Sequence, residues 1–140
     1  MKDLRELARV LDAQRATYAK MLEMEEEKSQ ALIKGDADSL TRVMSGQQAL
    51  MVQARGLEDR RMKLCEGTAP TLREFVDSSP ECREALEPVS LALSETVRSL
   101  KKKNLRNRKL LEARLVTIRF MNQQLGLSPN TYGKGVTVKA

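Results

Sequence analysis

The 140-residue chain contains no histidine and no tryptophan, and aromatic residues make up only 3% of it. Without histidine, general acid–base catalysis would depend on carboxylates or lysine. Gly133 and Gly135 flank a lysine, but they lack the strand–loop–helix context of a phosphate-binding loop. The sequence therefore argues against an enzyme. It predicts no catalytic residue, no cofactor and no small-molecule substrate.

Cysteine is also scarce, since Cys65 and Cys82 are the only two. Two cysteines without any histidine cannot supply the four ligands of a zinc site, so no metal is predicted. They could pair in an oxidising compartment, but the first residues are charged and lack the apolar core of a signal peptide. No stretch of eighteen uncharged apolar residues is present, so no membrane span is predicted. We expect a cytoplasmic protein with two reduced, partly buried thiols.

The few aromatic residues leave Leu, Met, Val and Ala to form the core, which suits a helical bundle better than a β-sandwich or barrel. Apolar residues recur at spacings of three and four up to Gly126, and no segment alternates as a strand does. We predict an all-α protein, with a long antiparallel helical hairpin plus a long third helix in a coiled-coil-like bundle. Residues 1–126 would form a single domain, and residues 127–140 a mobile C-terminal tail.

The hairpin is predicted from two helices, at about Asp3–Lys34 and Ala37–Glu66. Gly35 between them supplies a left-handed stop, and Asp36 stands where the next N-cap is needed. Because this turn is so short, the second helix must return antiparallel to the first. The apolar stripe of the first helix thins across Glu25, Lys28 and Ser29, which we expect at an end of the bundle or in water.

A short helix is predicted after the break at residues 67–70. Thr71 and Glu74 have the spacing of a capping box, in which each side chain satisfies a backbone N–H of the first turn. This helix should run to about Asp77.

The last helix is predicted from about Val89 to Leu125. Ser79 and Pro80 start a helical segment before it, with serine as the cap and proline at the first helical position. Pro88 cannot donate a backbone hydrogen bond in mid-helix. We therefore expect a kink or a fresh start there.

Two asparagines, Asn104 and Asn107, fall inside the apolar stripe of the last helix. A buried asparagine lowers stability but fixes register, because it must find a polar partner. We predict that both set register, and that leucine at both positions would raise the melting temperature. In the alternative, both face solvent through a small phase shift of the helix.

The far end of the last helix is the predicted partner-binding site. The first two helices, of about 32 and 30 residues, are too short to cover its whole apolar stripe. A large uncovered stripe normally marks an interface. The predicted binding residues are Leu111, Leu115, Ile118, Met121 and Leu125.

Positive charge is concentrated on the same helix. Residues 98–119 hold nine basic residues and one acidic residue, whereas the whole chain has a net charge of +6. A nucleic-acid-associated basic coiled-coil protein is therefore an alternative, and a purely structural bundle subunit is a third possibility. Against nucleic acid, the cations surround the helix outside its apolar stripe, and no aromatic residues interleave for base stacking. We favour a solvated face, or one that meets acidic segments of a protein partner.

Several segments, in their order along the chain, resemble the family of FlgN-type flagellar export chaperones. They comprise a Glu-rich stretch before a Gly-Asp turn, two motifs of the second helix, an asparagine-marked stretch and a Tyr-Gly tail. These segments are 22–28, 31–32, 35–40, 47–50, 57–60, 104–111 and 131–135. The resemblance spans nearly the whole chain.

The resemblance implies a cytosolic chaperone of the flagellar type III secretion system. Its clients would be hook-associated proteins of the hook–filament junction, of the FlgK and FlgL type, held unassembled before export. Their terminal amphipathic helices would fit a helical groove. The tail would dock on the export-gate protein, of the FlhA type, with Tyr132 as its anchor. In the alternative, the tail is a disordered end and this tyrosine is incidental.

Overall fold

A computed structural model describes residues 4–65 and 71–126 of the chain. Its helices are α1 (Leu4–Lys34), α2 (Ala37–Leu64), α3 (Leu72–Asp77) and α4 (Pro80–Leu125). The described ranges contain no strand, so the predicted all-α fold is confirmed. None of the helices in these ranges is both long and apolar enough to cross a bilayer. The predicted tail and Tyr132 lie outside the described residues.

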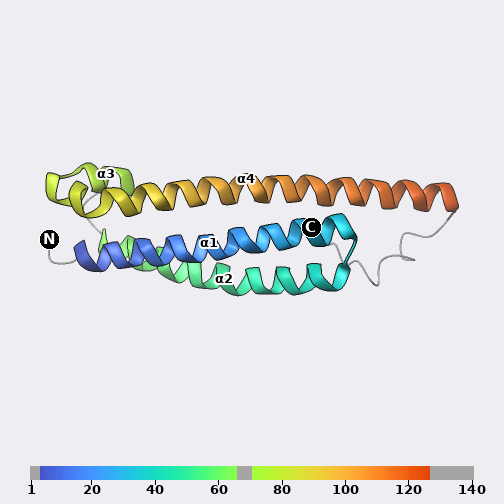
Figure 1. Ribbon diagram of the computed structural model, residues 1–140, viewed down its shortest axis with the longest axis horizontal. Coiled ribbons are helices and arrows are strands. Elements are labelled where there is room, and N and C mark those ends of the chain that lie inside the picture. Colours follow the sequence, from blue (N-terminus) through green and yellow to red (C-terminus); the bar gives the residue numbers. More distant parts are fainter. Residues whose placement is uncertain (1–3, 66–70, 127–140) are drawn as a thin grey trace.

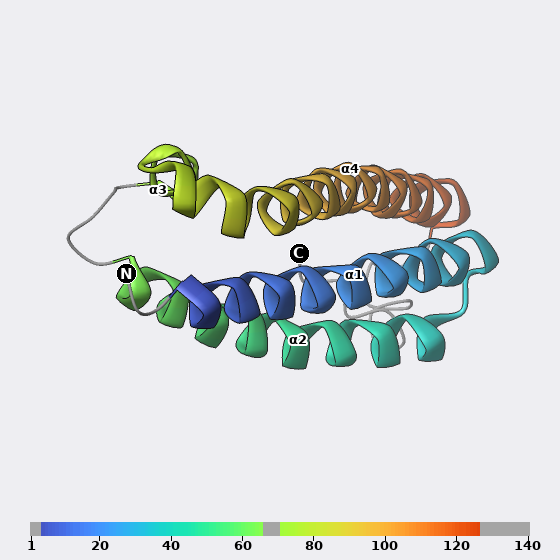
Figure 2. The same cartoon turned by 60° about the vertical axis from the view of Figure 1, so that its left-hand side comes forward.

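Helix α1 is the central element of the fold. It packs against α2 to form the predicted antiparallel hairpin, and it packs against α4 on another side. Both views place α2 and α4 on opposite sides of α1 (Figure 1, Figure 2). The side chains of α1 therefore form the middle of the bundle.

The turn of the hairpin follows from two local signals in the sequence. Gly35 has a positive φ of 71°, a left-handed conformation that glycine adopts without a steric penalty. The Asp36 carboxylate accepts a hydrogen bond from the backbone N–H of Ser39 at 3.1 Å. This interaction lowers the pKa of Asp36. The predicted stop and cap are both confirmed.

The apolar core lies at the end of the hairpin opposite this turn. There α3 packs on the start of α4, close to the start of α1 and the end of α2. Leu7, Phe75 and Leu86 are almost completely buried. Cys65 and Cys82 are buried in the same cluster as thiols, with no disulfide between them. This end of the bundle is therefore well packed with apolar side chains.

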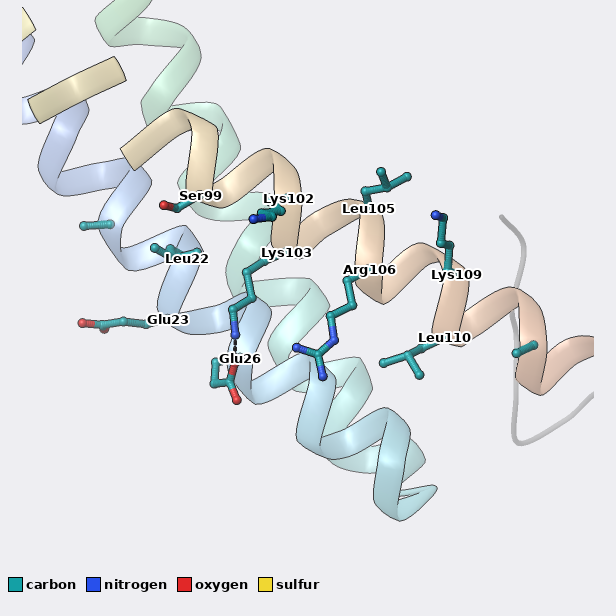
Figure 3. Close-up of a pocket in the computed structure, with 12 residues that line it drawn as sticks. Leu22, Glu23, Glu26, Ser99, Lys102, Lys103, Leu105, Arg106, Lys109 and Leu110 are labelled. Carbon is teal, nitrogen blue, oxygen red and sulfur yellow. Dashed lines mark hydrogen bonds and ion pairs between the residues drawn. The ribbon is translucent and has the colours of Figure 1, made fainter. Parts of the chain in front are cut away.

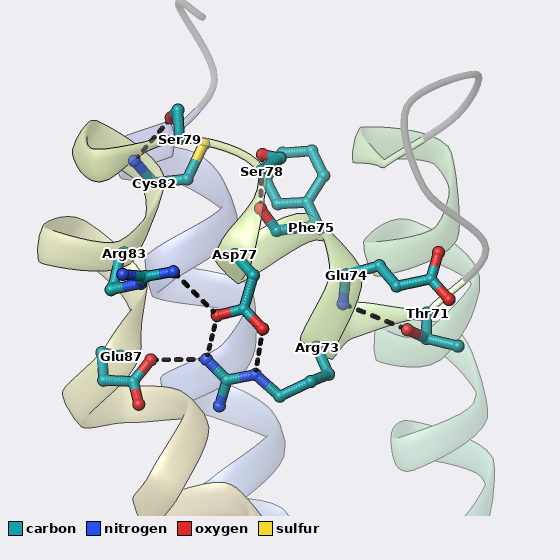
Figure 4. Close-up of polar contacts among 10 residues, drawn as sticks. All are labelled: Thr71, Arg73, Glu74, Phe75, Asp77, Ser78, Ser79, Cys82, Arg83 and Glu87. Carbon is teal, nitrogen blue, oxygen red and sulfur yellow. Dashed lines mark hydrogen bonds and ion pairs between the residues drawn. The ribbon is translucent and has the colours of Figure 1, made fainter.

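Helix α3 is held in place by a cap and by ion pairs (Figure 4). The Thr71 hydroxyl accepts a hydrogen bond from the Glu74 backbone N–H at 3.1 Å, as half of the predicted capping box requires. The Arg73 guanidinium donates to Asp77 at 2.9 Å and to Glu87 of α4 at 2.6 Å. The hydrogen bond from Arg73 lowers the pKa of Asp77. These pairs are partly exposed, so they orient α3 more than they stabilise it.

Helix α4 corrects the predicted boundary at Val89. The Ser79 hydroxyl accepts from the Cys82 backbone N–H at 3.1 Å, and a single helix then runs from Pro80 to Leu125 without a fresh start at Pro88. Pro88 removes the usual donor to the Glu84 carbonyl, but both residues are exposed. Leu86 packs the same turn into the core. Core packing on one face outweighs the missing hydrogen bond on the other.

Candidate partner-binding surface

Helix α4 extends beyond the hairpin. Its 46 residues correspond to about 69 Å, against about 46 Å for the 31 residues of α1. Beside the hairpin turn, the Arg114 guanidinium donates to the backbone carbonyl of Ile33 at 2.6 Å. Residues 115–125 continue roughly 16 Å past this contact, and Figure 1 shows them projecting beyond α1 and α2. We call this segment the overhang.

The predicted binding residues lie at or near the overhang, with unequal exposure. The side chains of Leu111, Leu115 and Ile118 are half-buried. Met121 and Leu125 are exposed, at 46% and 61%. The structure thus brings all five onto one helix end and leaves two of them open to solvent.

Sequence reasoning missed two further apolar side chains of the overhang. Val116 is 62% exposed and Phe120 is 59% exposed. Neither residue belongs to the apolar stripe predicted for the last helix. Phe120 carried a usable signal, because a rare aromatic residue outside the core stripe needs an explanation. The overhang is therefore apolar on more than one face, which is unusual for a helix in water.

A buried polar cluster lies beside the basic part of α4. Glu25 of α1 is only 2% exposed. Its carboxylate accepts hydrogen bonds from Asn107 at 2.9 Å and from Gln47 of α2, and it pairs with Lys28 at 3.2 Å. Asn107 also donates to the backbone carbonyl of Glu25 at 2.7 Å. Side chains from three helices thus converge on one carboxylate.

The location of Glu25 corrects the expectation that Glu25, Lys28 and Ser29 lie at an end of the bundle or in water. Burial raises the pKa of Glu25, but the hydrogen bonds from Asn107 and Gln47 and the charge of Lys28 lower it more, so the net shift is downward. Ser29 is also buried. The sequence predicted exposure of this stretch because its hydrogen-bond partners come from distant segments of the chain.

The two asparagines of α4 differ in their surroundings. Asn107 is 2% exposed, so the alternative that it faces solvent is wrong. Asn104 is half-buried and lies 3.4 Å from the Glu25 carboxylate, at the limit of a hydrogen bond. The structure therefore identifies a polar partner for Asn107. The register-setting role of Asn104 and Asn107 remains a prediction.

A groove of about 1100 Å³ lies between α1 and α4 (Figure 3). Apolar side chains on both helices line it, among them Ala19, Leu22, Leu105, Leu110 and Ala113. Charged residues flank them: Lys102, Lys103, Arg106 and Lys109 on α4, and Glu23 and Glu26 on α1. Lys103 forms an ion pair with Glu26 across the groove. Such a surface can bind an elongated amphipathic segment.

Comparison with protein-family models matches residues 1–138 to the family described as FlgN protein. This match covers nearly all of the chain, so the protein is a member of the FlgN family, and the resemblance predicted from the sequence is confirmed. Membership implies a general role as a flagellar export chaperone. No curated protein and no solved structure matches the chain.

Proposed function

We propose that this protein is a cytoplasmic chaperone that binds FlgK- and FlgL-type junction proteins before flagellar type III secretion and delivers them to an FlhA-type export gate. Family membership supports the chaperone class. The overhang supports a protein client, because it exposes Val116, Phe120, Met121 and Leu125 on the part of α4 that follows the contact between Arg114 and Ile33. This exposure is the observation that carries the proposal.

The proposed clients expose apolar stripes before assembly, because their terminal helices pack as coiled coils only in the finished filament. An uncovered apolar helix end can bind such a stripe by helix-in-groove packing. Each large apolar side chain that becomes fully buried contributes about 1.5–3 kcal/mol. A few such contacts are enough for a complex that is stable before export and still dissociable.

The test is binding of a purified FlgK-type protein, measured by calorimetry. Replacing Leu115 and Ile118 together with Asp should weaken binding at least about 100-fold, since two apolar contacts become charged. Replacing the more exposed Phe120 and Leu125 with Asp should have a similar effect with less risk to the fold.

The matched control is Val52→Asp with Met62→Asp on α2, where both side chains are also exposed, at 66% and 58%. This variant should bind as the wild type does, and circular dichroism should show unchanged helix content in all three variants. Unchanged affinity in both α4 variants would exclude the overhang as the client site. Loss of helix content in the Leu115→Asp/Ile118→Asp variant alone would mean that these two residues are core.

Delivery to the gate rests on the family resemblance and on the composition of the tail, in which Tyr132 is the only aromatic residue among residues 127–140. We expect Tyr132→Ala to retain client binding while binding to the cytoplasmic domain of an FlhA-type protein weakens and secretion of the junction proteins slows. The matched control is Thr131→Ala. Normal secretion by the Tyr132→Ala variant would leave the gate proposal without support, while the client proposal would stand.

A further inference from the structure

The groove between α1 and α4 has an uneven charge distribution. Four cations and two carboxylates flank its apolar lining, so its edges carry an excess of positive charge. Glu26 is already engaged by Lys103 and also lies close enough to Arg106 for the two charges to interact. Among the described residues, none forms an ion pair with Lys102 or Lys109. Glu23 likewise forms no ion pair among the described residues, so the unmatched charge of the groove is positive on balance, and its cations lie on α4.

The apolar lining of the groove leads directly to the overhang. Leu110 and Met121 are eleven residues apart, close to three helical turns, and Ala113 and Phe120 are seven apart, close to two. Each pair therefore shares one face of α4. Figure 3 shows Arg106 and Leu110 extending from α4 on the side of α1. From Ser99 to Met121 this face spans roughly 33 Å, the length of a helix of about 22 residues.

We propose that the groove and the adjoining face of the overhang bind one amphipathic helix of a protein partner, whose apolar face is flanked by acidic side chains. The apolar face would lie on Leu22, Leu110 and Ala113. The acidic flank would meet Arg106 and Lys109. The inference rests on the proposed function only in taking this partner to be an exported client.

Charge favours this occupant over two others. Residues 127–140 of the chain itself contain two lysines and no acidic residue, so like charges would oppose their binding. Nucleic acid would supply negative charge, but it would not bury the aliphatic lining, and Phe120 is a single aromatic side chain on the adjoining face, whereas stacking of successive bases uses several.

The test uses two labelled 22-residue amphipathic peptides with the same leucine face, one flanked by Glu and the other by Lys. Binding to the full-length protein is measured by fluorescence anisotropy, so no natural client is needed. We expect the Glu-flanked peptide to bind at least about tenfold more tightly, because its charges are complementary to the groove. Equal affinity of the two peptides would overturn the proposal.

Charge-reversal variants then locate the site. Arg106→Glu with Lys109→Glu should weaken the Glu-flanked peptide about tenfold. The matched control, Lys101→Glu with Arg108→Glu, makes the same change of charge on the same exposed helix, at residues that do not line the groove. It should change affinity by less than about threefold. Equal losses in the two variants would mean that only the overall field of α4 attracts the peptide.

An uncharged variant tests the apolar part of the groove. Ala113→Trp adds bulk at an exposed position without changing charge and should weaken the Glu-flanked peptide by about tenfold. Unchanged binding by this variant would overturn the assignment to the groove. Measured circular dichroism should remain that of the wild type, since the Ala113 side chain is not part of the core.

Two competitors and a sedimentation measurement distinguish the other occupants. Neither a single-stranded oligonucleotide nor a peptide of residues 127–140 should displace the Glu-flanked peptide. If either competitor displaces the Glu-flanked peptide from the wild type but not from the Arg106→Glu/Lys109→Glu variant, the groove is assigned to nucleic acid or to the tail of the chain. Sedimentation should show no self-association that depends on Arg106 and Lys109, because such a dimer would make a second copy the occupant. If these results all hold and the FlgK-type client still fails to bind, the groove proposal stands and the proposed function falls.

Discussion

The two ends of α4 have similar apolar character and opposite surroundings. Near its start, Leu86 and Leu93 are buried against α1 and the core cluster. Near its end, Phe120 and Leu125 are about 60% exposed. The difference arises from the neighbours, since residues of α1, α3 and the end of α2 share the core cluster with the first end, whereas Phe120 and Leu125 lie beyond the contact between Arg114 and Ile33. One helix therefore holds the fold together at one end and is available to partners at the other.

The largest expected effect is a difference between the two ends of α4 in how much a substitution lowers the free energy of unfolding. Leu86→Ala should lower the free energy of unfolding by about 2–5 kcal/mol, because it removes a fully buried side chain and leaves a cavity. Leu125→Ala, at the other end of the same helix and 61% exposed, should change it by less than about 0.5 kcal/mol. Urea denaturation of both variants measures the contrast. Similar losses at both sites would contradict this difference between the two ends of α4.

A smaller effect is expected at the polar cluster between the two ends. Asn107→Leu should lower the free energy of unfolding by about 1–3 kcal/mol, because the buried Glu25 carboxylate and a backbone carbonyl lose a donor. This is the opposite of the rise expected from the sequence, which treated the asparagines as polar residues without a charged partner. Thermal and urea denaturation give the sign directly.

Two further variants test the cause of this loss of stability. Asn104→Leu should have a smaller effect, since its contact with Glu25 is long and the side chain is half-buried. The double variant Glu25→Leu/Asn107→Leu should recover part of the loss, because an apolar pair replaces an unsatisfied charge. If the single Asn107→Leu variant is more stable than the wild type, apolar packing outweighs the hydrogen bonds of this cluster.

The smallest effect is a dependence on pH. The pKa of Glu25 lies below its ordinary value of 4.5 in the folded protein, so the ionised form contributes stability that is fully present above about pH 4.5. This contribution is lost as the pH falls through the folded pKa. Lys28 is the charged group that faces this carboxylate, and Gln47 and Asn107 contact it as neutral donors.

Glu25→Gln should therefore reduce the loss in the free energy of unfolding that accompanies acidification. This free energy is measured by urea denaturation between pH 3 and pH 7. The matched control is Glu23→Gln, at an exposed position on α1. In this control, the free energy of unfolding should fall with acidification as it does in the wild type. Identical curves for the wild type and Glu25→Gln would mean that the carboxylate is equally solvated in the folded and unfolded states.

The sequence predicted best those features that depend on neighbouring residues. Gly35 with Asp36, Thr71 with Glu74, and Ser79 with Pro80 each mark a helix boundary through contacts three or four residues apart, and the structure has a boundary at each. The boundary at Val89 failed because packing around Leu86 outweighs the local effect of proline. Local signals identify where a helix can start, and tertiary packing decides where it continues.

Features that depend on distant residues were predicted less well. Glu25 follows Met24 and precedes two more glutamates, so its surroundings in the sequence are those of a solvated charge. Its burial depends on Gln47 and Asn107, which lie 22 and 82 residues away. Phe120 was missed for a different reason, because it lies off the single apolar stripe used for the prediction. The overhang itself could be predicted, because helix lengths can be compared before their packing is known.

The contact between Arg114 and Ile33 marks where the hairpin turn lies along α4, so the length of the hairpin sets how much of α4 extends beyond it. Adding seven residues to each of α1 and α2 would keep their apolar faces in register and carry the turn roughly 10 Å farther along α4. The core around Phe75 and Leu86, at the opposite end, would be unaffected. The length of the hairpin thus sets the length of the overhang. It could be adjusted, by evolution or by design, to suit partners of different size without rebuilding the fold.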